Sequence, residues 1–297
     1  LGLEAAKALV TLGLDTYVVE FAPQLMGVQL DAAGGEILKR KIEALGVKVL
    51  TGKNTKEILS NTARHSDDTS SDGQHLTMQF TDGTSLTTDM IVFSAGIRPQ
   101  DGLIKNNPEC GIEMGGRGGI LINEQCRTNV DHVYAVGECA VWDNKVFGLV
   151  APGYNMASIC AAQIAGDSKQ IFTGADMSTK LKLMGVDVGS IGDAHGSSEG
   201  SLSYLYQNPA EGIYKKLVTT PDNKRLLGAV LVGDTEDYNN LLQLYLNDID
   251  LPAHPESLIL PNVEKPVMGI DNLPDTATIC SCYNVTKGAI CSAVENG

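Results

Sequence analysis

The sequence predicts an α/β protein in which a parallel sheet is followed by a smaller α+β domain. Helix-like and strand-like segments alternate over the first hundred residues, and several apolar strands end at a glycine or a carboxylate. Short strands separated by turns then fill residues 179–250. Open α/β sheets bind ligands at the carboxyl ends of their strands, so the residues at those ends are the candidate site residues.

The 297-residue chain has a globular composition, with 43% hydrophobic and 20% charged residues and a net charge of −14. Its acidity argues against nucleic acid or an anionic membrane as a partner, since both require basic surfaces. No apolar run approaches the roughly 18 residues of a membrane helix.

The seven cysteines, of which the first four are scattered, favour a reducing cytoplasm over a disulfide framework. The chain opens inside a helical pattern, which suggests a fragment of a longer protein.

The first segments fit the second half of a βαβ unit. Residues 3–13 predict a helix closed at Gly13, and residues 16–20 predict a strand that ends at Glu20. Gly2 and Glu20 have the spacing of the last glycine and the ribose-binding carboxylate in a dinucleotide fingerprint. A carboxylate at Glu20 accepts from a free 2′-hydroxyl and repels a 2′-phosphate, which favours NADH over NADPH. The alternative is a helix and strand of any α/β protein.

The chain up to residue 99 continues the same alternation. The predicted elements are a helix at 31–45, a strand at 47–50, a polar loop at 60–73 that includes His65, a hairpin at 76–86 and a buried parallel strand at 89–94. The last strand leads to Gly96, where a dinucleotide can approach the backbone closely, and to Arg98-Pro99, which directs the chain into another domain. A simple domain crossover is the alternative for Gly96.

A second candidate site lies at Gly137-Glu138, where residues 128–138 predict a turn and a short apolar strand. The glycine permits close approach of a ligand, and Glu138 accepts hydrogen bonds from sugar-like hydroxyls. Residues 119–123 predict another strand. Residues 147–154, which include Pro152, lead into an Ala-rich helix at about 155–164 whose free N–H groups suit a negatively charged group. An ordinary buried strand and a packed helix are the alternatives.

Residues 179–250 predict a separate small domain. Its expected strands are 180–185, 203–206, 214–218 and 226–231, and an amphipathic helix around 241–246 is expected to begin at Thr235 or Asp237. Asp193 and His195 are interpreted as a structural loop pair, with a catalytic pair as the alternative.

Residues 251–277 contain five prolines and predict an extended linker. Cys280 and Cys282 then precede a helix capped at Thr286, and two thiols at this spacing can point at one metal site. Cys291 lies in the following helix and is expected to be a core residue, with a third metal ligand as the alternative.

Together these stretches resemble the FAD-dependent pyridine-nucleotide reductases and, more specifically, the large subunit of the NADH-dependent, sirohaem-containing assimilatory nitrite reductases. The matching stretches follow the family order at residues 18–26, 96–101, 135–139, 147–154, 180–189 and 279–282. The resemblance implies a Rossmann-like FAD/NAD(P)-binding reductase fold. The implied parts are an NAD-binding domain at 1–95, the C-terminal part of an FAD-binding domain at 96–170, an α+β interface domain at 171–250, a linker at 251–277 and the start of a BFD-like 2Fe–2S domain at 278–297.

The resemblance also implies cofactors and residue roles. NADH would reduce FAD, and electrons would pass through a 2Fe–2S cluster to the sirohaem and 4Fe–4S centre of the full-length enzyme, where nitrite becomes ammonium. Glu138 would hold the ribityl chain, and Glu4 would face the nicotinamide and flavin. The implied cofactor-binding residues are Gly2, Glu4, Glu20, Gly96, Gly137, Glu138 and Pro152. Cys280 and Cys282 would supply half of the cluster ligands, with the second pair outside this chain.

The resemblance implies no side-chain nucleophile, and it suggests a contact with a small subunit or a second copy through residues 171–250. One alternative is an NADH-dependent ferredoxin or rubredoxin reductase, against which Cys280 and Cys282 argue because simple carrier reductases lack that extension. A fragment that docks a partner and performs no chemistry is an alternative of another class.

Overall fold

The computed structural model describes residues 1–61, 75–167, 169–263, 273–280, 283 and 285–296. The chain divides into two compact units. The first unit contains residues 1–95, 179–245 and 249–266, and the second contains residues 96–178, 246–248 and 267–297. The segment 96–178 is therefore inserted between two parts of the first unit.

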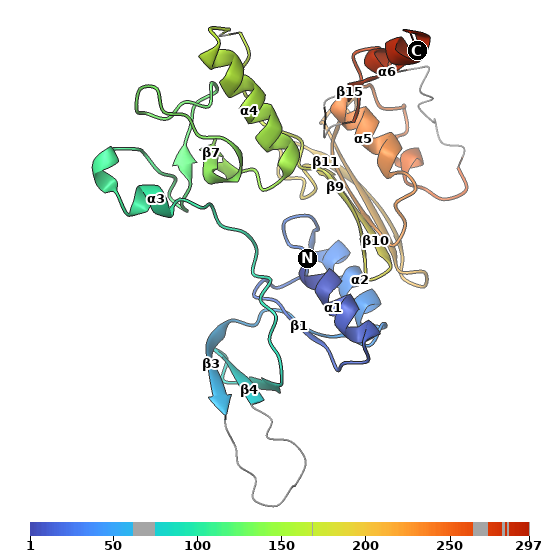
Figure 1. Ribbon diagram of the computed structural model, residues 1–297. Helices are drawn as coiled ribbons and strands as arrows, with labels where there is room; N and C mark the ends of the chain where they lie inside the picture. The colour runs from blue at the N-terminus through green and yellow to red at the C-terminus, as the bar shows by residue number, and fades with distance from the viewer. Residues whose placement is uncertain (62–74, 168, 264–272, 281–282, 284, 297) are drawn as a thin grey trace, which may run out of the picture. The chain divides into compact units, whose positions relative to one another are not determined.

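The first unit begins with the helices and strands that the sequence predicts (Figure 1). Helix α1 (Gly2–Thr11) is followed by Gly13, whose φ of +80° turns the chain toward β1 (Tyr17–Val19). Helix α2 (Ala32–Glu43) leads to β2 (Lys48–Leu50), and β2 pairs in parallel with β1. These elements confirm the predicted parallel α/β arrangement.

An antiparallel sheet of β3 (Thr55–Asn61), β4 (His75–Phe80) and β5 (Ser85–Thr88) follows. The hairpin of β4 and β5 confirms the prediction for residues 76–86, whereas β3 was not predicted. Most of the predicted polar loop at 60–73, including His65, lies outside the described residues.

The predicted buried strand at residues 89–94 is wrong. The segment joins no ladder within the part of the chain that the structure describes, and Phe93 is 74% exposed. Its apolar sequence is typical of a parallel strand covered on both faces. Burial of such a strand requires a neighbouring strand, and among the described residues β1 and β2 pair only with each other.

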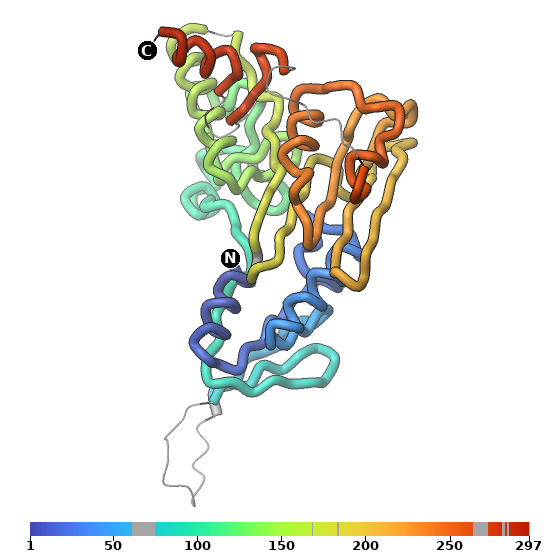
Figure 2. Tube along the Cα trace, turned by 90° about the vertical axis from the view of Figure 1, so that its right-hand side faces the viewer, coloured from blue at the N-terminus to red at the C-terminus, as the bar shows by residue number. Residues whose placement is uncertain are grey.

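The remainder of the first unit is a five-stranded antiparallel sheet with the order β11-β12-β13-β10-β9. Its strands are β9 (Thr179–Leu183), β10 (Val186–Gly192), β11 (Leu202–Asn208), β12 (Ile213–Thr219) and β13 (Leu226–Val232). Strand β10 was not predicted, because the strand expected at 180–185 corresponds to β9 alone. Helix α2, drawn in blue in Figure 2, packs against these yellow and orange strands.

Both faces of this sheet are covered. Val188, Val230 and Val232 share one hydrophobic cluster with Ile37 and Leu38 of α2. Helix α5 (Tyr238–Leu246) packs its Tyr238 ring on Gly189, where an added Cβ would come within 2.7 Å of the ring. Side chains of successive strand residues point to opposite faces, so α5 and α2 lie on opposite sides of the sheet (Figure 1).

Two adjacent lysines of β12 anchor these two helices. Lys215 is 3% exposed and lies 2.5 Å from Asp234 and 2.7 Å from Asp237, just before α5. Lys216 is 7% exposed and lies 3.2 Å from Asp31, just before α2. Each helix start therefore carries a carboxylate that pairs with a buried lysine of the sheet.

The second unit contains α3 (Gly102–Lys105), a sheet of β6 (Ile120–Leu121), β7 (Ala140–Trp142) and β8 (Lys145–Val146), and α4 (Val150–Ile164). Its core includes Phe147, Met156 and Phe172, and the Trp142 ring meets the Phe172 ring edge-on with centroids 5.3 Å apart. Two 3-10 turns, η1 (Pro108–Cys110) and η2 (Gly137–Cys139), connect these elements.

The C-terminal residues add three short elements and one helix. The expected linker contains the turn η3 (Pro255–Leu258), in which Leu258 is only 1% exposed, so this part of it is packed rather than extended. Strands β14 (Thr278–Cys280) and β15 (Val285–Thr286) pair, and α6 (Lys287–Asn296) follows. Thr286 Oγ1 accepts the N–H of Ala289 at 3.2 Å, as expected of a helix cap. Among the helices described, none has the length and apolar character needed to cross a membrane.

Candidate functional site

Glu20 lies at the carboxyl end of β1, as the fingerprint spacing predicts. Its N–H donates to the carbonyl of Leu50 at 2.9 Å, and its own carbonyl accepts the N–H of Lys53 at 3.0 Å. The side-chain Oε1 accepts the N–H of Ala22 at 2.8 Å. These bonds fix both the backbone and the carboxylate of Glu20 while leaving the residue half-buried.

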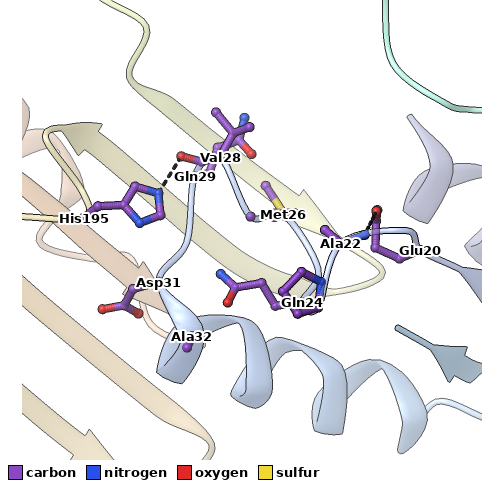
Figure 3. A pocket seen from close by; sticks show the side chains of 11 residues that line it. Glu20, Ala22, Gln24, Met26, Val28, Gln29, Asp31, Ala32 and His195 are labelled. Atoms are coloured by element: carbon purple, nitrogen blue, oxygen red, sulfur yellow. Dashed lines mark hydrogen bonds between the residues drawn. The ribbon is translucent and has the colours of Figure 1, made fainter. Parts of the chain in front are cut away.

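An open cavity of about 570 Å³ lies beside Glu20 (Figure 3). The loop between β1 and α2, together with one residue of the five-stranded sheet domain, forms its walls. Among the described residues, two carboxylates line the cavity, Glu20 and Asp31, and no lysine or arginine does. The lining residues are Glu20, Ala22, Pro23, Gln24, Met26, Gly27, Val28, Gln29, Asp31, Ala32 and His195.

Asp31 forms one wall of the cavity and caps α2. Its Oδ1 accepts the N–H of Gly34 at 3.0 Å, and its Oδ2 accepts from the Tyr214 hydroxyl at 2.7 Å and from Lys216 Nζ at 3.2 Å. Burial alone would raise the pKa of Asp31, but these donors outweigh it and hold the pKa below its usual value. The same arrangement raises the pKa of Tyr214, mainly through burial and then through the bond to Asp31.

The remaining predicted residues of the first unit lie on α1. An added Cβ at Gly2 would come within 3.3 Å of the Ser94 side chain, so the helix start and the end of the 89–94 segment approach closely there. Glu4 is exposed in the first helical turn. Of Gly2, Glu4 and Glu20, only Glu20 lines the cavity.

The Gly137-Glu138 motif of the second unit lies in the turn η2, immediately before β7. The predicted apolar strand before it is wrong: residues 133–136 form no ladder strand, and Tyr134 makes only an isolated bridge to Arg127. Gly137 has a φ of +77°, with open space where a Cβ would be. Glu138 is exposed, and within the described part of the chain its carboxylate makes no hydrogen bond or ion pair. It is available to a ligand.

The N-terminal turn of α4 packs against this motif. An added Cβ at Gly153 would lie 3.5 Å from the Cα of Gly137. Pro152 is buried in the same turn, and no side chain caps the helix start. Uncapped N–H groups and the helix dipole favour negative charge at this end. The structure thus brings Gly137, Glu138 and Pro152 together.

Gly96 begins the second unit with a φ of +80° and is exposed. The following residue, Ile97, packs so closely on Gly148 that an added Cβ there would clash with Ile97 Cδ1 at 2.1 Å. Gly148 lies two residues before α4, so the 95–99 crossover adjoins the approach to that helix.

Met156 belongs to this arrangement but was not predicted. Its Sδ accepts the N–H of Gly137 at 3.3 Å, and the residue is completely buried. A methionine in an Ala-rich helix is typical of an ordinary core residue, so no local signal in the sequence identified Met156 as part of the site. Gly153, directly after Pro152, was a detectable signal because a helical glycine often permits close backbone approach.

The cysteines have different environments. Burial, and next the neighbouring Cys160, raise the pKa of the Cys126 thiol to about 11, so Cys126 is an inert core thiol at neutral pH. Cys280 is half-buried at the end of β14, whereas Cys282 lies outside the described residues. Among the residues described, no three His, Cys, Asp or Glu side chains gather as a metal site. Cys291 is exposed on α6, so its predicted core position is wrong.

The sequence of residues 1–187 matches the pyridine nucleotide-disulphide oxidoreductase family. The chain belongs to this family. Residues 178–248 of the oxidoreductase chain also match the rubredoxin NAD+ reductase C-terminal domain. A ferredoxin reductase from Rhodopseudomonas palustris has the same fold, with a TM-score of 0.66 and 18% identity over 88% of this chain and 60% of its own.

Curated relatives of this oxidoreductase chain include two bacterial nitrite reductase subunits. The nitrite reductase (NADH) large subunit of Escherichia coli (strain K12) is 55% identical over 300 residues, which cover 100% of this chain and 34% of the relative. The NAD(P)H nitrite reductase large subunit of Klebsiella oxytoca is also 55% identical over 300 residues, or 100% of this chain and 30% of the relative. The chain therefore spans about a third of the length of these relatives.

Proposed function

We propose that this chain is the electron-input part of an NADH-dependent nitrite reductase large subunit, in which NADH reduces FAD. The observation that carries this proposal is the 55% identity with nitrite reductase large subunits along the entire chain, including both family-matched segments. The two candidate sites support it. One offers a fixed carboxylate beside a cavity, and the other offers an exposed carboxylate in the turn against which the start of α4 packs.

The cavity beside Glu20 is the proposed site of the adenosine half of NADH. The carboxylate would accept from the ribose hydroxyls. The described residues of the walls include two acidic side chains and no lysine or arginine, which disfavours a 2′-phosphate. Gly2 at the start of α1 would permit close approach of the pyrophosphate to the helix. Glu4, one turn into α1, is proposed to face the nicotinamide and flavin.

The η2 turn and the start of α4 form the proposed FAD site. The residues fit the cofactor because Glu138 is exposed and has no bonding partner among the described residues, and Gly137 leaves open space beside it. Glu138 would hold the ribityl hydroxyls, Pro152 and the uncapped α4 start would face the pyrimidine side, and Gly96 would border the cofactor. When bound, FAD converts a two-electron hydride donor into a source of single electrons. The chain's own residues position it and stabilise negative charge.

The iron–sulfur part of the proposal concerns the full-length enzyme. Cys280 and Cys282 would supply two ligands of a 2Fe–2S cluster, which needs four. Two cysteines alone do not hold a 2Fe–2S cluster, so the cluster is proposed for the full-length enzyme and not for this chain. The sirohaem, the 4Fe–4S centre, nitrite as substrate, a cytoplasmic location and a subunit contact through residues 171–250 are likewise proposed for the full-length protein only.

A carrier reductase is the second candidate, because residues 178–248 match the rubredoxin NAD+ reductase C-terminal domain. In that case the flavin would pass its electrons to a separate ferredoxin or rubredoxin.

The deciding experiment is a visible absorption spectrum of the full-length gene product before and after anaerobic addition of NADH. We expect flavin bands that bleach with NADH and sirohaem bands that shift when nitrite is added. Bleaching without sirohaem would favour the carrier reductase. A spectrum without flavin would contradict both assignments.

A further inference from the structure

His195 joins the sheet domain to the loop that walls the Glu20 cavity. Its Nε2 lies 3.1 Å from the carbonyl oxygen of Val28, and Figure 3 shows this bond closing one side of the cavity. A carbonyl only accepts, so Nε2 carries the proton and donates. His195 is the one lining residue from the segment 179–250, since the others lie between residues 20 and 32.

The backbone beneath His195 is held firmly. Asp193, two residues before it, accepts the N–H groups of Gly196, Ser197 and Ser198 and both serine hydroxyls. The buried Lys216 donates to the His195 carbonyl at 3.1 Å. The ring therefore projects from a rigid support on the five-stranded sheet.

The loop that His195 contacts has less support. Val28 is 82% exposed, and the backbone bonds nearby run from the N–H groups of Gln29 and Leu30 to the carbonyl of Met26, both at 2.9 Å. Gln24 Nε2 donates to the Leu30 carbonyl at 2.6 Å. These bonds lie within the loop. The bond from His195 connects the exposed tip of the loop to the part of the first unit that contains the five-stranded sheet.

We propose that His195 is a positioning residue for NADH, which acts by holding the 21–30 loop in the conformation that lines the adenosine cavity. The proposal rests on the assignment of the Glu20 cavity to the adenosine half of NADH. His195 acts through its bond to the Val28 carbonyl, so another side chain with an N–H donor at the position of Nε2 should replace it. Loss of one such bond should weaken NADH binding about five- to tenfold, without slowing hydride transfer once NADH is bound.

The experiment compares His195→Ala, His195→Phe and His195→Gln in the FAD-loaded full-length gene product. Flavin reduction is followed with NADH and with reduced nicotinamide mononucleotide, which lacks the adenosine half. Calorimetric titration with ADP-ribose measures the adenosine subsite directly. His254→Ala is the matched control, because His254 has an 83% exposed side chain and does not line the cavity.

We expect the Ala and Phe variants to bind NADH and ADP-ribose about five- to tenfold more weakly, with an unchanged limiting rate and unchanged use of the mononucleotide. Gln retains an N–H donor at similar reach and should stay within about twofold of the wild type. Wild-type affinity in the Ala or Phe variant, or a Gln variant as weak as Ala, would overturn the proposal. A wild-type flavin that NADH does not reduce would instead count against the proposed function, and the ADP-ribose titrations would still test His195.

Discussion

At the scale of single residues, the proposed site makes Glu20 the side chain expected to select the nucleotide. Its carboxylate is fixed by the Ala22 N–H, and within the described part of the chain no lysine or arginine lines the cavity to offset its charge. Glu20→Ala should weaken NADH binding about tenfold and weaken NADPH binding less, because the repulsion of the 2′-phosphate is lost together with the ribose bonds. The KM values of the full-length gene product for both nucleotides measure this change in preference.

Glu36→Ala is the control for Glu20. Glu36 lies on the exposed surface of α2, where it pairs with Arg40 at 2.9 Å, and it is not part of the cavity. This variant should keep the wild-type ratio of KM values. A Glu20→Ala enzyme with the same ratio as the wild type would show that the fingerprint assignment is wrong.

Asp31 combines a helix cap with a buried ion pair, and its loss should be costly. Asp31→Asn removes the charge that Lys216 faces and leaves this buried lysine without its carboxylate, for an expected loss of about 2–3 kcal/mol in the free energy of unfolding. Urea unfolding at pH 7 measures the loss. Asp15→Asn, which removes an exposed pair with Lys48, should cost less than about 1 kcal/mol.

The contribution of Asp31 should also depend on pH in a defined direction. The folded pKa of Asp31 is lowered, so its stabilising effect is fully present above the unfolded value of about 3.9 and is lost as the pH falls through the lower folded value. The stability difference between the wild type and Asp31→Asn should therefore be constant from pH 7 to about 5 and shrink below about 4. A difference that grew on acidification would contradict the depressed pKa.

At the scale of elements, α4 and η2 are coupled by the bond from the Gly137 N–H to Met156 Sδ. Met156→Leu keeps the volume of the side chain but removes the acceptor, so we expect FAD binding to weaken about three- to tenfold with little change in thermal stability. Titration of the full-length apoprotein with FAD measures the effect. Met78→Leu on the β4 hairpin of the first unit is the control, and equal FAD affinity in the two variants would mean that the bond has no role in holding the motif.

Local sequence patterns predicted the elements whose signals are local. The boundary of α2 followed from Asp31 and its apolar stripe, and the β4–β5 hairpin followed from Asp82-Gly83 between alternating residues. Residues 89–94 show the limit of this reasoning. Their composition indicates burial, but burial depends on a neighbouring strand, and composition does not supply the neighbour.

The residues of the candidate site likewise divide into those with a local sequence signal and those without one. Glu20 was singled out by its spacing from Gly2, and Glu138 by a glycine–carboxylate pair after an apolar segment, and both positions have local signals in the sequence. His195, Met156 and the pair Lys215-Lys216 act through partners far away in the sequence, such as Val28 for His195. A lysine pair in an apolar strand also gives no indication that each lysine points to a different buried carboxylate.

At the scale of the whole molecule, the acidic charge of the chain has a consequence for nucleotide binding. The net charge of −14 and the Glu20 carboxylate create a negative field at the cavity, since Lys216 offsets the charge of the second carboxylate, Asp31, and NADH is itself an anion. Salt shortens the Debye length from about 30 Å at 0.01 M to about 8 Å at 0.15 M, which screens this repulsion. The KM of the full-length gene product for NADH should therefore fall about two- to threefold over this range of NaCl concentration.

The direction in which the KM for NADH changes with NaCl distinguishes an acidic site from one in which lysine or arginine dominates. A lysine or arginine that held the pyrophosphate would make binding weaker as salt rises, so a KM that increased with NaCl would show that such a contact outweighs the acidic field. Reduced nicotinamide riboside carries no phosphate and serves as the uncharged control, with a KM that should not change with salt. Because the Glu20→Ala variant removes one of the two cavity carboxylates, its KM for NADH should respond less steeply to salt than that of the wild type.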